Sequence, residues 1–137
     1  MATPQLHTRH VALKPCIHPV DLAGGPFTGD YVHMKYYDAV LVCSYVATLF
    51  GAETVTVQQC TQDNDACGDA KAIGAGKTIT SVSNTIQTVN VTAPELDVDG
   101  GFEWLEITSN VGPQLGCIFI AAYRFRYAEQ PMIDPMA

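Results

Sequence analysis

One acidic segment has the residue types of a calcium-binding loop. Asp63, Asp65 and Asp69 stand at the first, third and seventh places of such a loop, and Gly68 stands at the sixth. The twelfth place is Gly74, where a calcium loop requires a bidentate Glu. We therefore expect a surface turn of the Asx type, with a weak divalent-cation site as the alternative.

The beginning of the chain holds residues that can ligate zinc, namely His7, His10, Cys16 and His18. His7 and His10 would meet on one helical turn, but prolines flank these residues and no second close Cys pair completes a zinc pattern. We expect polar contacts of an extended segment, with a metal site as the alternative. The sequence assigns no metal ligand and no cofactor.

A glycine, lysine and threonine at positions 76–78 resemble the end of a phosphate-binding loop. That loop needs a further glycine five positions before Gly76, where this chain has Lys71, and it needs a helix afterwards. A Thr/Ser-rich strand is predicted there instead. We interpret the glycines as turn residues and expect no nucleotide site.

Catalytic machinery is absent from the sequence pattern. There is no nucleophile elbow, and no Cys stands with a His in a known signature. Glu103 and Glu106 lie at odd spacing along a predicted strand, so they are expected to point to opposite faces unless a bulge intervenes. No residue is assigned a catalytic role, and we expect that the protein is not an enzyme.

The chain has five cysteines, an odd number. Cys16, Cys43 and Cys117 lie in or beside apolar segments, where a thiol behaves as a small hydrophobe. Cys60 and Cys67 flank a polar turn, and a disulfide between them is the alternative to the reduced thiols that we expect.

The elements that must position these residues are predicted to be strands. No stretch keeps a helical period over ten residues, whereas short runs rich in Val, Thr and Tyr recur between turn signals such as the glycine pair after Asp99. About seven or eight short strands favour a mainly β fold, an antiparallel β-sandwich. The predicted strands cover residues 31–37, 39–48, 53–60, 78–82, 85–91, 103–108 and 116–126.

Proline-bearing segments flank this domain. Residues 1–28 contain four prolines and are predicted to form an extended N-terminal arm, with one short strand at about residues 11–14. Residues 29–127 form the β-sandwich domain, and residues 128–137 form an extended C-terminal tail. Such arms gain order by lying on a neighbouring surface or on the body of their own fold.

Charge and hydropathy narrow the classes of partner. The formal net charge is −7 and only 15% of the residues are charged, so we expect no nucleic-acid partner. The longest apolar run, residues 117–123, is too short for a membrane span, and the first ten residues contain no apolar signal segment. We expect a protein made in the cytosol, with no membrane partner and a neutral surface that other subunits can cover.

Three stretches are similar to a known class of protein: GDYVHMKYYD at 29–38, VQQCT at 57–61 followed by KA at 71–72, and LDVDGGF at 96–102. They resemble the cement or decoration proteins of tailed bacteriophage heads, over roughly residues 21–127. The resemblance implies a virion structural protein on the outer capsid surface, assembled in the host cytoplasm. Its partner would be the major capsid protein, and it would form a homo-oligomer, with a trimer favoured.

Two other functions fit the same fold. One is a head-completion, connector or tail structural protein. The other is a carbohydrate-binding β-sandwich module, in which Trp104 and exposed tyrosines would stack on sugar rings.

Overall fold

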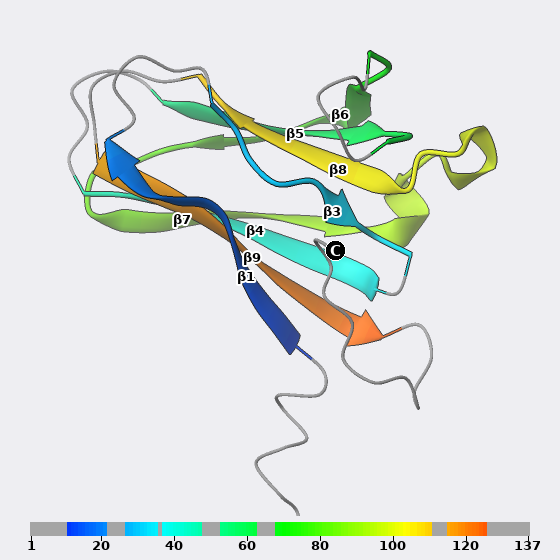
Figure 1. Ribbon diagram of the computed structural model, residues 1–137, viewed down its shortest axis with the longest axis horizontal. Coiled ribbons are helices and arrows are strands. Elements are labelled where there is room, and N and C mark those ends of the chain that lie inside the picture. Colours follow the sequence, from blue (N-terminus) through cyan, green and yellow to red (C-terminus); the bar gives the residue numbers. More distant parts are fainter. Residues whose placement is uncertain are drawn as a thin grey trace, which may run out of the picture.

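The computed structural model describes residues 11–21, 27–35, 37–47, 53–62, 68–110 and 115–125. Two antiparallel sheets pack face to face, as the sequence predicts (Figure 1). The first, called sheet A here, has the order β1 (Val11–Asp21), β9 (Leu115–Phe125), β4 (Tyr37–Val46) and β7 (Thr85–Thr92). The second, sheet B, has the order β2 (Phe27–Thr28), β8 (Trp104–Ser109), β5 (Thr54–Cys60) and β6 (Lys71–Thr80), and β3 (Val32–His33) also pairs with β8.

The core lies between the sheets because successive side chains of a strand point to opposite faces. On β5 the predicted alternation is confirmed: Val55 and Val57 are fully buried, whereas Thr54 and Thr56 are half-buried on the other face. Sheet A contributes a matching row of buried aliphatic residues from β4 and β9. The residues of this row are Val40, Val42, Ile118, Ile120 and Ala122.

The described part of the predicted N-terminal arm belongs to the sandwich. β1 pairs with β9 from Val11 to Asp21 as the edge strand of sheet A, and it is much longer than the predicted strand at residues 11–14. The pairing shifts register after Pro15 and again after Ile17. An edge strand tolerates proline because only one side of its backbone must pair. Residues 1–10, 22–26 and 126–137 lie outside the described residues.

β6 begins seven positions before the predicted strand at 78–82. Val57 of β5 pairs with Lys77, and the next residue of β5 pairs with Ala72, so the residues between them form a bulge in β6. Gly74 and Gly76 sit in this bulge with φ of 57° and 113°, a region that glycine adopts readily. The two glycines therefore shape a bulged strand, and the strand that follows is not the helix a phosphate loop requires.

Two short 3-10 helices, η1 (Ala93–Glu95) and η2 (Val98–Gly100), connect β7 of sheet A to β8 of sheet B. Asp97 caps η2 by accepting the Gly100 N–H at 3.1 Å, and Gly101 ends it in the left-handed conformation with φ of 85°. This confirms the predicted turn at Asp99 and the two glycines. Beyond it, Ile107 enters the core while Phe102 and Trp104 remain half-buried.

Candidate protein-interaction surface

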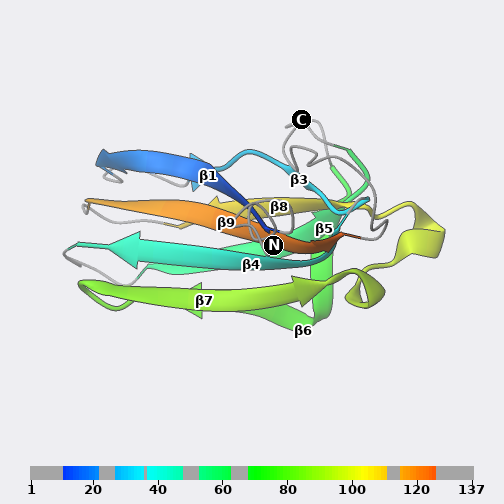
Figure 2. The ribbon, with the colours of Figure 1, turned by 90° about the horizontal axis from the view of Figure 1, so that it is seen from below.

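The outward side of sheet A is built by all four strands, which lie side by side in Figure 2, and it is mostly apolar on β4 and β9 and mostly uncharged polar on β7. The strands' alternation places on this side the residues between the core positions, and the pairing aligns Leu41 with Ala121 and Cys43 with Phe119. We call this side the outer face of sheet A. Its described residues are Leu13, Ala39, Leu41, Cys43, Tyr45, Ile86, Thr88, Asn90, Thr92, Cys117, Phe119, Ala121 and Tyr123.

None of these residues is charged, although the chain carries a net charge of −7. Tyr123 donates its hydroxyl hydrogen bond to the side-chain oxygen of Asn90 at 2.7 Å, and Tyr45 donates to that of Asn84 at 2.6 Å. The polar atoms of the tyrosines are thus already paired within the chain. Leu13 is 68% exposed and Ile86 is 56% exposed, so both side margins of the face reach solvent.

This arrangement explains why both sides of β9 are apolar in the sequence. Ile118 and Ile120 face the core, whereas Phe119 and Ala121 belong to the outer face of sheet A. Sequence reasoning recognised the apolar character of β4 and β9, but not that β1 and β7 extend the same face. The alternation of β7, with Val89 and Val91 between Thr88, Asn90 and Thr92, is the signal for it.

The outer face of sheet B is different in chemistry. The ring of His33 stacks on Trp104 with centroids 4.1 Å apart and planes 9° apart, so one side of the indole is already covered. Tyr31 donates to the Glu106 carboxylate at 2.7 Å, and Glu103 lies 3.5 Å from His33. Glu103 precedes β8, so strand alternation does not govern it, and the expectation that it points away from the side of Glu106 is wrong.

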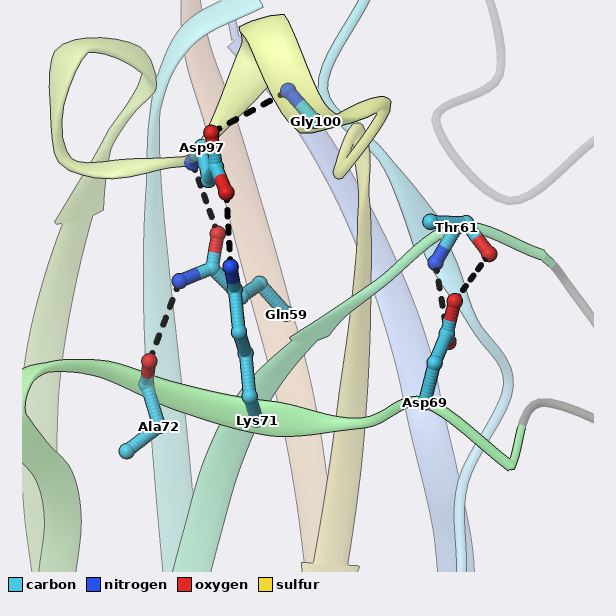
Figure 3. A network of polar contacts seen from close by, with 7 residues as sticks. All are labelled: Gln59, Thr61, Asp69, Lys71, Ala72, Asp97 and Gly100. Carbon is cyan, nitrogen blue, oxygen red and sulfur yellow. Dashed lines mark hydrogen bonds and ion pairs between the residues drawn. The ribbon is translucent and has the colours of Figure 1, made fainter.

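A network of polar contacts links β5 and β6 of sheet B to Asp97 at the start of η2 (Figure 3). The Lys71 ammonium is 2.7 Å from the Asp97 carboxylate and 3.9 Å from the centroid of the Phe102 ring. Gln59 accepts the Asp97 N–H at 2.8 Å and donates to the Ala72 carbonyl at 3.0 Å. The hydrogen bond from Lys71, with that from Gly100, lowers the pKa of Asp97 below its ordinary value. Every charge here has a partner, so the network is structural.

The predicted calcium segment is only partly described. Residues 63–67 lie outside the described residues, and Asp69 accepts hydrogen bonds from the backbone and the hydroxyl of Thr61. Asp69 thus makes local hydrogen bonds of the kind expected of a turn. Gly74, the twelfth place, belongs to the bulge of β6.

For the zinc alternative, His7 and His10 lie outside the described residues, as does the side chain of His18. Cys16 is buried, and its thiol donates to the Asp30 carbonyl at 3.4 Å. Burial, together with the charge of Asp30, raises the pKa of Cys16 to about 12, which keeps it protonated. Among the described residues, no three His, Cys, Asp or Glu side chains gather into a metal-binding group.

Of the other cysteines, Cys43 and Cys117 lie on the outer face of sheet A, where burial raises the pKa of both thiols. Cys60 is fully buried beside Trp104 and Tyr31. Cys67 lies outside the described residues, so its pairing with Cys60 stays a prediction.

No protein-family model, curated protein or solved structure matches this chain. Among the described residues, no helix has the length and apolar character needed to cross a membrane.

Proposed function

We propose that this chain is a virion structural protein of the cement or decoration class, which binds neighbouring major capsid subunits on the outside of the shell. The observation that carries the proposal is the outer face of sheet A, which includes no charged residue among its described side chains although the chain is acidic. Leu13 and Ile86 are exposed on this face, Leu41 and Phe119 are half-buried between them, and exposed apolar side chains gathered on one face are typical of a protein contact. The sequence resemblance supplies the class of partner.

The binding mechanism follows from the chemistry of the face. Covering Leu13, Leu41 and Phe119 removes apolar area from water without burying an unpaired charge. Acidic side chains elsewhere on the chain keep it from binding DNA. Contacts that bridge adjacent capsid subunits stabilise the shell, because rupture must also break them.

The first test is rebinding to purified particles from which the chain has been stripped. Leu13→Glu places a charge on the outer face of sheet A. Removing this carboxylate from water on binding is expected to lower the affinity by about tenfold or more, because a cost of about 1.4 kcal/mol corresponds to a factor of ten. The matched control is Thr56→Glu, which adds the same charge to the outer face of sheet B. Equal rebinding of both variants would contradict the proposed surface.

The second test is copy number in intact particles. A number proportional to that of the major capsid protein supports the cement function. A number of about six or twelve would indicate a ring at one vertex, as in a connector, and would overturn it.

A further inference from the structure

β7 forms an edge of sheet A, and its own sequence has none of the features that usually block pairing at an edge. The strand, TIQTVNVT, contains no charged residue, no proline and no glycine. It pairs with β4 on one side, and β4 continues to β9, so β7 ends the sheet. Natural edge strands are commonly protected by prolines, charges or bulges. Any such protection of β7 therefore comes from outside the strand.

Lys77 of β6 brings a charge to this edge from the other sheet. It pairs with Val57, which is fully buried, so Lys77 lies on the core side of sheet B although β6 is itself an edge of that sheet. β6 and β7 lie at the same side of the sandwich (Figure 2). The Lys77 ammonium crosses between them, donates to the Asn90 carbonyl at 3.1 Å and lies 2.7 Å from the Glu95 carboxylate. An inward-pointing charge is one of the devices that protect edge strands.

The Glu95 carboxylate binds a second backbone group of the same edge. It accepts hydrogen bonds from the Thr92 N–H at 2.7 Å and from the Thr92 hydroxyl at 3.0 Å. Burial alone would raise the pKa of Glu95, but the hydrogen bonds from Lys77 and Thr92 outweigh it and hold the pKa below its ordinary value. The ion pair is therefore fully charged at neutral pH.

The part of the β7 edge that remains open is short. In an antiparallel ladder, every second residue turns its N–H and C=O to the same side. The residues of β7 with outward groups are Ile86, Thr88, Asn90 and Thr92. Among the described residues, no group bonds the outward N–H or C=O of Ile86 or Thr88. This open stretch is at the lower limit of strand lengths, which are usually about 3 to 10 residues, and an added strand can pair further only by displacing the ion pair.

We propose that the pair of Lys77 and Glu95 is an autoinhibitory contact, which keeps β7 from adding a strand of another polypeptide. One lysine thereby protects two edges, because it belongs to β6 and binds to β7. The net charge of −7 repels other copies of the chain, but the ion pair occupies the backbone groups themselves. This inference concerns the isolated chain and does not depend on the proposed function.

The test compares two lysine variants of β6 at about 1 M salt, where the Debye length is about 3 Å and repulsion between the acidic chains is screened. Lys77→Met removes the ammonium and keeps most of the apolar stem. Lys71→Met is the matched control, because it removes the same charge from the same strand and breaks another 2.7 Å ion pair, that with Asp97. Light scattering after size exclusion is expected to give 14.8 kDa for the wild type and for Lys71→Met, and at least twice this mass for concentrated Lys77→Met.

A second substitution locates the association on β7. Thr88→Pro removes an outward N–H and leaves the hydrogen bonds to β4 intact. Lys77→Met combined with Thr88→Pro is therefore expected to return to 14.8 kDa. Association that Thr88→Pro does not reverse would overturn the proposal. A Lys77→Met variant with the mass of the wild type, or a Lys71→Met variant that associates equally, counts against it as well.

Glu95→Gln decides the matter if circular dichroism shows that Lys77→Met does not fold. The glutamine keeps an acceptor oxygen for the Thr92 N–H but loses the charge that holds the Lys77 ammonium at the edge. This variant is expected to associate at high salt to a smaller extent than a variant without the lysine. A folded Glu95→Gln variant that stays as monomeric as the wild type would refute the autoinhibitory contact.

Discussion

Glu53 is a buried carboxylate that ties the two sheets together. It is 0% exposed, and its Oε1 accepts hydrogen bonds from the hydroxyl of Ser81 at 2.7 Å and from that of Ser44 at 3.3 Å. Ser44 comes from β4 of sheet A, whereas Glu53 immediately precedes β5 of sheet B. The sequence offers no sign of this contact, because Ser81 is 28 positions from Glu53 and all three residues are ordinary in type.

We expect Glu53→Leu to reduce the free energy of unfolding by about 1–3 kcal/mol, because Ser44 and Ser81 would keep buried hydroxyls without this acceptor. Glu53→Gln retains an acceptor oxygen and is expected to cost less. Urea unfolding of the two variants measures the difference. A leucine variant as stable as the wild type would show that the hydroxyls find other partners.

Cys16 is expected to be an unreactive thiol. Its raised pKa, about 12, and its burial leave almost no thiolate at pH 8, whereas Cys117 is partly exposed. Alkylation of the native protein, followed by mass spectrometry, should label Cys117 well before Cys16. In denaturant the two should react alike. Early labelling of Cys16 in the native state would mean that β1 opens readily from the sheet.

At the level of elements, the turn at η2 depends on the charge of Asp97. Its pKa is lowered mainly by the hydrogen bond from Lys71, so the carboxylate stabilises the fold above the ordinary pKa of 3.8 and loses this effect as the pH falls through its lower folded value. Asp97→Asn should therefore lower the thermal midpoint at pH 7, and the difference from the wild type should shrink below about pH 3.8. If the difference in thermal midpoint did not change with pH, the variant would be destabilised by altered hydrogen-bond geometry and not by the lost charge.

The strands illustrate which elements a sequence predicts. The sequence predicts β4, β5 and β9 well. Their Val-rich segments, bounded by polar turns, are typical of strands that are buried on one or both faces. The continuation of β1 beyond residue 14 and the start of β6 were missed. Pro15 and Gly74 are signs of irregular backbone in isolation, and only their places, on an edge strand and in a bulge, make them compatible with a sheet.

For the whole molecule, stability should follow the core between the sheets and not the outer face of sheet A. Leu105 is fully buried on β8, and Leu105→Ala is expected to cost about 2–5 kcal/mol through lost contacts and a cavity. The same substitution at Leu13, which is 68% exposed, should change stability by less than about 0.5 kcal/mol. Equal costs in chemical denaturation would mean that the outer face is itself covered in the isolated chain.

The sequence by itself determined the mainly β class and the central strands, because burial of one face imposes a period of two on a strand. Composition determined the scarcity of charge, which limits the partners that the surface of the protein can bind. The tertiary structure decided which apolar side of each strand faces the core and which faces outward. It also decided that β7 ends a sheet with its Thr88 backbone open. These properties depend on strand order, and strand order arises from contacts between residues distant in the chain, which a local pattern does not encode.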